Sequence, residues 1–219
     1  MPDSPRLTLP GGFRYRLCMT KPDRTAAWPL ILASASPRRR ELLRRIGVRF
    51  EVRPAEIPEE RDPGEAPGAF AGRLAREKAL HVARQTGPEP NRWVLGADTI
   101  VVLEEDVLGK PDDPQHAVEL LSRLVGRSHS VITAVALTDT RTLETRSAEV
   151  ASRVTMRFAS REEIEAYVAG GEPLDKAGAY ALQGEGRHFI QRVEGSESNV
   201  IGLPLDETLA LLCQAGIET

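Results

Sequence analysis

Cysteine, aromatic residues and long apolar runs are all scarce in this chain of 219 residues. Its two cysteines, Cys18 and Cys213, form no CxxC pair; we expect free thiols in the cytoplasm, with a disulfide between them as the alternative. Aromatic residues make up 5% of the chain and the net charge is -3, which argues against a stable nucleic-acid complex. No run approaches the roughly 18 apolar residues of a membrane span, so we expect no membrane partner.

Lysine is also scarce, and the positions that keep it are informative. Only four of the 29 basic residues are lysines, so the other 25 are arginines. Because ammonium and guanidinium groups are not interchangeable, a lysine within the domain calls for a specific explanation. Lys78, Lys110 and Lys176 suit contacts with a phosphate oxygen or a buried carboxylate, whereas chance survival is the alternative. The fourth, Lys21, lies in the N-terminal segment.

The periodicity of apolar residues predicts strands and helices that alternate along the chain. Neighbouring strands between residues 130 and 158 are expected to be antiparallel, which indicates an α/β fold with a mixed sheet and flanking helices. The strand at 93–103 is expected to be interrupted at 96–99, and Phe158 to alternate in phase with Met156. Further strands are expected at 30–33, 50–52, 107–108, 130–137, 149–158 and 188–193, and helices at 37–46, 70–85, 113–126, after a Ser160–Glu163 capping box, and from Pro204 onward.

One segment and one single residue have side chains suited to phosphate and metal chemistry. The first runs from Ser34 to Arg40, where a strand meets a helix N-terminus; its serines and arginines predict a polyanion cradle, or else an ordinary cap before a solvated basic face. The second is Asp98, whose carboxylate within an apolar strand indicates a metal ligand, a general base or a hydrogen-bonded structural residue. One carboxylate from the acidic loop at 56–67 could join it. These residues alone do not choose among the alternatives.

Several common site patterns are missing. The chain has no GxxxxGK[ST] motif, no GxGxxG after a strand and no nucleophile elbow, which disfavours the common nucleotide-binding folds and serine hydrolases. The four histidines have no metal-ligand spacing, and we expect each to be structural or exposed.

Taken together, the motifs resemble the Maf family of nucleoside triphosphate pyrophosphatases. The resemblance covers essentially residue 29 to the C-terminus and rests on LILASASPRRRELL (30–43), LAREKA (74–79), GADTIV (96–101), LGKP (108–111), GRSHSVITAVAL (126–137), GEPLDKAGAYALQG (171–184) and GLPL (202–205). It implies a deep cleft, an architecture related to inosine-triphosphate pyrophosphatase, and a single catalytic domain at 29–219 with two lobes. Residues 1–28 are then a disordered extension, or translation begins at Met19.

The resemblance also implies roles for particular residues. Asp98 corresponds to the proton acceptor and, with Glu59, to the site of a divalent cation, Mg²⁺ or Mn²⁺. Lys78 and Lys110 are the other catalytic groups. The substrate-binding residues implied are Ser34, Ser36, Arg38, Arg39, Thr99, Asp175, Lys176 and Gln183; among them Arg39, Thr99 and Gln183 resemble the branch of the family that acts on dTTP and UTP.

The activity expected from this resemblance is metal-assisted hydrolysis of dTTP, UTP or modified pyrimidine nucleotides to the monophosphate and pyrophosphate, in the cytoplasm. Its partner is the nucleoside triphosphate, with a homodimer left open. One alternative is a 7-methyl-GTP or broader-specificity pyrophosphatase. A second is a non-catalytic nucleic-acid-binding regulator of cell division that uses the arginines between residues 38 and 53.

Overall fold

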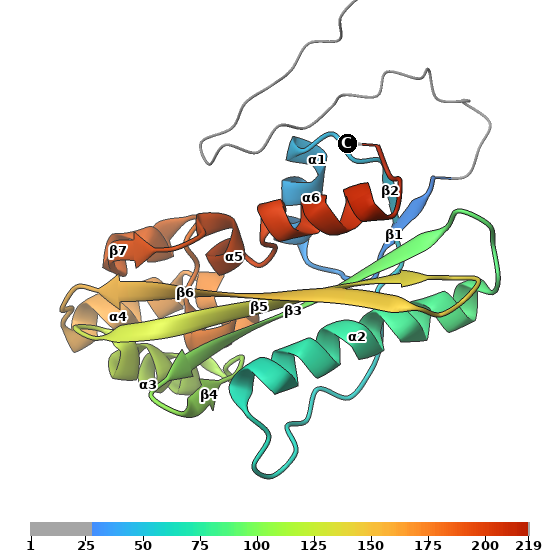
Figure 1. Cartoon of the computed structure of the whole chain (residues 1–219). Coiled ribbons are helices and arrows are strands. Elements are labelled where there is room, and N and C mark those ends of the chain that lie inside the picture. Colours follow the sequence, from blue (N-terminus) through green and yellow to red (C-terminus); the bar gives the residue numbers. More distant parts are fainter. Residues whose placement is uncertain (1–27, 219) are drawn as a thin grey trace, which may run out of the picture.

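A computed structural model describes residues 28–218 of the chain (Figure 1). The expectations for the N-terminal extension and for Cys18 fall outside this part, and no helix within it is long and apolar enough to cross a bilayer. The elements are β1 (Leu30–Leu32), α1 (Pro37–Arg45), β2 (Phe50–Val52), α2 (Pro67–Thr86), β3 (Trp93–Leu103), β4 (Asp106–Leu108), α3 (Pro114–Leu124), β5 (Ser128–Asp139), β6 (Thr145–Met156), α4 (Arg161–Ala169), three 3₁₀ turns η1 (Glu172–Asp175), η2 (Ala177–Ala179) and η3 (Glu185–Phe189), β7 (Ile190–Glu194), α5 (Glu197–Ile201) and α6 (Leu205–Gln214).

The strands form one mixed sheet in the order β2-β1-β3-β5-β6-β7, with β4 also paired to β3. The pairs β1–β2 and β1–β3 are parallel, while β3–β5, β5–β6 and β6–β7 are antiparallel. Helix α2 lies on one side of the sheet and α1 and α6 on the other (Figure 1). The expected mixed α/β fold with flanking helices is therefore confirmed.

Side chains alternate between the two faces of β3 and so divide the core. Val94 and Val102 belong to the cluster packed under α2, whereas Leu95 packs with α1 and α6. Further along the same strand, Val101 joins the cluster formed with α3 and α4. The face opposite α2 therefore holds two separate apolar clusters, and Thr99 lies on the strand between them.

The edge of β3 has a gap between its two neighbours on that side. Strand β1 pairs with β3 only up to Leu95, and β4 pairs with it only from Val101 onward. Within residues 28–218, no strand covers that edge at 96–100, although β5 pairs with the same residues on the other edge. The residues that follow β1 and β4 therefore flank the gap, and both faces of the sheet are accessible from it.

The expected interruption of β3 at 96–99 is wrong, because the strand is continuous. Gly96 lies where α2 crosses the strand, and a Cβ atom at this position would be 2.2 Å from the carbonyl oxygen of Ala75. The glycine therefore permits a close approach of helix and strand, and does not mark a break. Asp98 lies within the continuous strand, beside the edge gap.

The expected position of Phe158 is also wrong, since its side chain is 80% exposed. Strand β6 ends at Met156, after an irregularity in its pairing with β7, so the alternation does not extend to residue 158. By contrast, the capping predictions are confirmed. Ser36 accepts the amide N–H of Arg39, and Ser160 forms a capping box with Glu163.

Replacement of Gly96 by alanine should destabilise the fold by about 3 kcal/mol, because the added methyl group clashes with helix backbone that cannot rotate away. Gly72→Ala on α2 is the matched control, since its Cβ would meet only the flexible end of Arg76 and alanine favours helix. Urea unfolding measures both. A Gly96→Ala variant as stable as Gly72→Ala would contradict the close-approach argument.

His129 should make stability depend on pH. Burial lowers the pKa of this imidazole to about 4, and its Nε2 lies 2.7 Å from the Tyr180 hydroxyl. The unfolded state, with a pKa near 6.5, takes up a proton first as the pH falls, so the stability that the neutral ring permits is lost between about 6.5 and 4. From pH 7 to pH 5 the loss should be about 2 kcal/mol. Urea unfolding at the two pH values should show this difference in the wild type and a smaller one in His129→Gln.

Candidate active site

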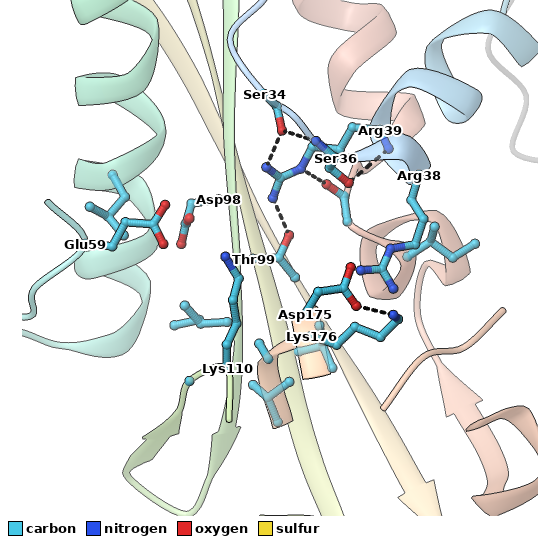
Figure 2. A pocket seen from close by; sticks show the side chains of 18 of the residues that line it. Ser34, Ser36, Arg38, Arg39, Glu59, Asp98, Thr99, Lys110, Asp175 and Lys176 are labelled. Carbon is cyan, nitrogen blue, oxygen red and sulfur yellow. Dashed lines mark hydrogen bonds and ion pairs between the residues drawn. The ribbon is translucent and has the colours of Figure 1, made fainter. Parts of the chain in front are cut away.

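A cleft of about 620 Å³ opens at the gap in the sheet edge (Figure 2). Its walls come from the β1–α1 connection, β3, the turn after β4, the acidic loop before α2 and the segment after η1. All twelve residues singled out in the sequence line this one cleft: Ser34, Ser36, Arg38, Arg39, Glu59, Lys78, Asp98, Thr99, Lys110, Asp175, Lys176 and Gln183. The chain thus brings together groups that lie up to about 150 residues apart.

The β1–α1 connection holds its serines and Arg39 in one fixed arrangement. Arg39 donates from Nε to the carbonyl oxygen of Gly202 (2.8 Å), from Nη1 to Ser34 Oγ (3.1 Å) and from Nη2 to Thr99 Oγ1 (3.0 Å). Burial lowers the pKa of Arg39, and the negative charges of Asp98 and Glu59 oppose this shift. Figure 2 shows Arg38 beside Asp175 on the other side of the cleft. Two adjacent arginines therefore face different parts of the site.

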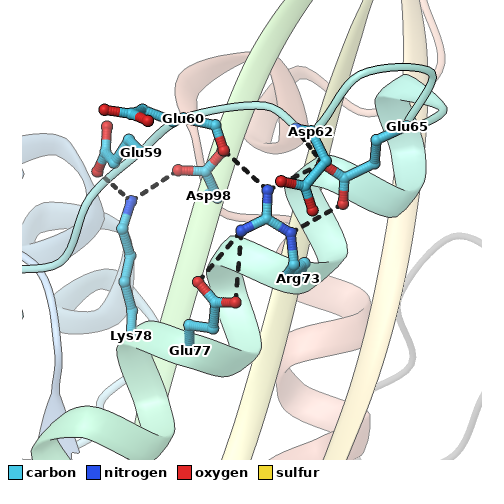
Figure 3. A network of polar contacts seen from close by, with 8 residues as sticks. All are labelled: Glu59, Glu60, Asp62, Glu65, Arg73, Glu77, Lys78 and Asp98. Atoms are coloured by element: carbon cyan, nitrogen blue, oxygen red, sulfur yellow. Dashed lines mark hydrogen bonds and ion pairs between the residues drawn. The ribbon is translucent and has the colours of Figure 1, made fainter.

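A second cluster consists of one ammonium group between two carboxylates. Lys78 Nζ lies 2.7 Å from Asp98 Oδ1 and 2.6 Å from Glu59 Oε1 (Figure 3). Asp98 and Lys78 are each only 7% exposed, so each buried charge depends on the other for compensation. Partial burial alone would raise the pKa of Glu59, but the hydrogen bond and charge of Lys78, with Lys110 and Arg39, lower it.

The loop that carries Glu59 is held to α2 by an arginine that the sequence did not single out. Arg73 donates to both carboxylate oxygens of Glu65 (2.9 and 2.8 Å) and to the carbonyl oxygen of Glu60 (2.9 Å), with Glu77 on its other side (Figure 3). Because Glu60 follows Glu59 directly, this contact fixes the backbone next to the acidic group. In a chain with 25 arginines no local pattern distinguishes this one.

The opposite wall carries Lys110, Gln183 and the pair Asp175–Lys176. Lys176 Nζ donates to the Asp175 carboxylate and to the carbonyl oxygen of Glu172. Burial would raise the pKa of Asp175, but Lys176 and Arg38 lower it overall. Lys110 follows β4 at the flank of the gap and is exposed. Positively charged side chains therefore reach the cleft from three parts of the chain, with Arg38 on α1, Lys110 after β4 and Lys176 after η1.

Thr133 is a further residue that the sequence analysis missed. It is fully buried on β5 opposite Thr99, and the two hydroxyl oxygens lie 3.0 Å apart. Because the Thr133 hydroxyl donates to the carbonyl oxygen of Asn199 (2.8 Å), the Thr99 hydroxyl must be the donor to Thr133. The hydrogen bonds thus run without a break from Arg39 through Thr99 and Thr133 to α5.

The acidic pair fits a hard divalent cation. Asp98 and Glu59 already share one cation, Lys78, and carboxylate oxygens are the ligands that Mg²⁺ and Mn²⁺ prefer. Among the described residues no group of three or more acidic, histidine or cysteine side chains forms a complete cage. Such ions commonly take one or two carboxylates and complete their shell with water and substrate phosphates. The donor set therefore suits an ion bound together with a phosphate-bearing substrate.

Comparison with known proteins shows which family this chain is similar to. A family model described as Maf-like protein matches residues 29–215. The chain belongs to the Maf family. Among its Maf relatives, a dTTP/UTP pyrophosphatase from Myxococcus xanthus is 54% identical over 188 residues, covering 86% of this chain and 93% of the relative. A dTTP/UTP pyrophosphatase from Escherichia coli O157:H7 is 50% identical over 183 residues, covering 84% and 91%. A HAM1 protein from Coxiella burnetii aligns with a TM-score of 0.46 at 17% identity, over 84% of this chain and 98% of that chain.

Removal of the Arg73 side chain should loosen the acidic loop of this Maf protein while leaving the sheet intact. In Arg73→Ala, amide hydrogen exchange at residues 59–65 should become about tenfold faster or more, because the Glu60 and Glu65 contacts are lost. Arg161→Ala removes an exposed ion pair with Glu165 on α4 and serves as control. Unchanged exchange at 59–65 would show that Arg73 does not hold the loop.

Proposed function

We propose that this protein hydrolyses dTTP and UTP to the nucleoside monophosphate and pyrophosphate, as a cytoplasmic enzyme. The observation that carries the proposal is the buried Asp98, held by Lys78 in a cleft that also collects Arg38, Lys110 and Lys176. A carboxylate able to take a proton therefore lies beside cations able to hold a polyphosphate. The names of the relatives, which cover more than four fifths of this chain at about 50% identity, support the same reaction.

The triphosphate binds between the β1–α1 connection and the lysine-bearing wall. Ser34, Ser36 and the N-terminus of α1 offer hydroxyl and amide donors, and Arg38 and Arg39 add charge-assisted ones. Lys110 and Lys176 face the same space as point charges on flexible stems. Substrate binding thus neutralises a cleft in which positive groups outnumber carboxylates.

Hydrolysis proceeds by attack of water on the α-phosphorus. The water oxygen forms a bond to this phosphorus while the bond from it to the oxygen that bridges the α- and β-phosphates breaks. Asp98 accepts the proton from the water, and the leaving pyrophosphate keeps the electron pair of the broken bond. Lysine ammonium groups stabilise the negative charge that develops on the leaving group, so the acceleration comes from positioning and electrostatics.

Asp98 and Glu59 are the residues that would hold a divalent cation. When bound, Mg²⁺ or Mn²⁺ supplies neutralisation of phosphate charge and polarisation of the reacting phosphoryl group. Lys78 contacts both carboxylates and keeps them close together in the absence of substrate. Its ammonium group also lowers the pKa of Glu59, which keeps that carboxylate ionised.

Selectivity for thymine and uracil follows from the hydrogen bonds already made inside the cleft. The Thr99 hydroxyl accepts a bond from Arg39 and donates its proton to Thr133, so its remaining capacity is a single lone pair. Such a group complements the N3–H donor of uracil and thymine, whereas N3 of cytosine is itself an acceptor. Gln183, exposed on the opposite wall, offers an amide able to pair with base carbonyl groups. A site built on such pairing rejects mismatched bases strongly.

Pyrophosphate release from dTTP, UTP, CTP and 7-methyl-GTP, each with and without Mn²⁺, tests the proposal. Release from dTTP and UTP in excess over the other two is expected. Activity on 7-methyl-GTP alone would keep the reaction and overturn the selectivity. Inactivity on all four would favour the nucleic-acid-binding alternative.

Asp98→Asn should lower turnover of dTTP by about 10²- to 10⁴-fold, because the amide cannot accept the proton from water. The asparagine oxygen still accepts a hydrogen bond from Lys78, and Glu59 keeps a negative charge beside that ammonium group, so the variant should stay folded although less stable than the wild type. Asp106→Asn makes the same chemical change at an exposed carboxylate paired with Arg123 and should leave turnover unchanged. Full activity of Asp98→Asn would contradict the assigned role.

A further inference from the structure

The segment from Lys176 to Phe189 forms one wall of the cleft with little regular structure. Two short 3₁₀ turns, η2 and η3, are its only helical elements, and Gln183 lies between them. A side chain that selects a base must be held in one place, because a mobile group discriminates poorly. The contacts that hold this segment in place therefore affect recognition.

Glu172, at the start of η1, makes the side-chain contacts that hold the part of this segment just after Gln183. Its Oε1 accepts the Tyr167 hydroxyl (2.9 Å) and the amide N–H of Gly186 (3.1 Å), and its Oε2 accepts the amide N–H of Glu185 (3.0 Å). Burial would raise the pKa of Glu172, but these donors lower it overall. One ionised carboxylate thus binds α4 and two consecutive amides of the loop, those of the second and third residues after Gln183.

The backbone of the loop is shaped to approach this carboxylate. Gly184 has a φ of +98°, and a Cβ atom there would lie 2.5 Å from Glu172 Oε2. Any other residue would both strain the backbone and push the carboxylate away from the amides. The glycine beside Gln183 is therefore part of the same contact.

The main chain of Glu172 holds the phosphate side of the wall. Its carbonyl oxygen accepts the ammonium group of Lys176, which also contacts Asp175. The side chain of Glu172 thus holds the backbone next to Gln183, which is proposed to select the base. Its main chain holds Lys176, which is proposed to bind phosphate. Glu172 does not line the cleft itself.

We infer that Glu172 is a positioning residue for base selection, which clamps the 184–186 backbone so that Gln183 is held at a fixed distance from the phosphate-binding lysine. This inference rests on the proposed function. It adds a residue outside the cleft to the determinants of specificity. It also predicts that damage to the clamp affects discrimination between bases more than the chemical step, since Asp98 and Lys78 are carried by β3 and α2 and not by this segment.

Glu172→Gln tests the clamp. Its amide nitrogen must face a donor N–H of the loop where a carboxylate oxygen accepted one, so the loop shifts. The ratio of kcat/KM for dTTP to that for CTP should fall about tenfold, mainly through KM for dTTP, with kcat changed less than about threefold. Tyr167→Phe, which removes one donor of three, should lower the ratio in the same direction by a smaller factor.

Two comparisons separate positioning from a general structural effect. In a Gln183→Ala background, Glu172→Gln should leave the dTTP/CTP ratio unchanged, because the group that it positions is gone. Glu165→Gln, which removes an exposed charge on α4, should leave both kcat and the ratio at wild-type values. An unchanged ratio in Glu172→Gln, or an equal loss on both nucleotides, would overturn the inference alone. A wild-type protein that hydrolyses neither nucleotide would overturn the proposed function, and the inference with it.

Discussion

The buried ammonium group of Lys78 is the constraint around which this site is arranged. Taking a charged group out of water costs several kcal/mol unless opposite charges meet it at close range. Asp98 comes from β3 and Glu59 from a loop, so α2, the strand and the loop must all converge on the same point. The close crossing at Gly96 brings the helix near the strand, and Arg73 secures the loop. Core packing and the acidic pair thus depend on one another.

The two sides of the cleft are built differently. On one side, Arg39, Thr99 and Thr133 form a continuous set of hydrogen bonds across a helix and two long strands, so these groups are held by regular structure. The other side is an irregular segment held through side chains such as Glu172. Arg39 and Asp98 therefore lie on regular elements, whereas Lys176 and Gln183 lie in the irregular segment.

The sequence predicts the parts that depend on local chemistry. Residue type and spacing predict the Ser36 and Ser160 caps and the succession of strands and helices. They also single out the rare lysines, and in the structure the lysines at 78, 110 and 176 line one cleft. Pairings across the chain do not follow in this way. Gly96 resembled a strand break because its role depends on a helix about 20 residues earlier. No role was predicted for Arg73 or Glu172, since the backbone groups that they bind become adjacent to them only in the folded protein.

The gap in the edge of β3 also bears on association between chains. An open strand edge offers unpaired backbone groups to any passing extended segment, and proteins commonly shield such edges to avoid aggregation. At residues 96–100 the opening is bounded at one end by β1 and at the other by β4, which already occupy the positions that a longer incoming strand would need. A small ligand can enter a gap of this length, whereas a polypeptide cannot pair along it. The gap in β3 thus differs from an open strand edge, because it leaves no length of strand along which a second polypeptide could pair.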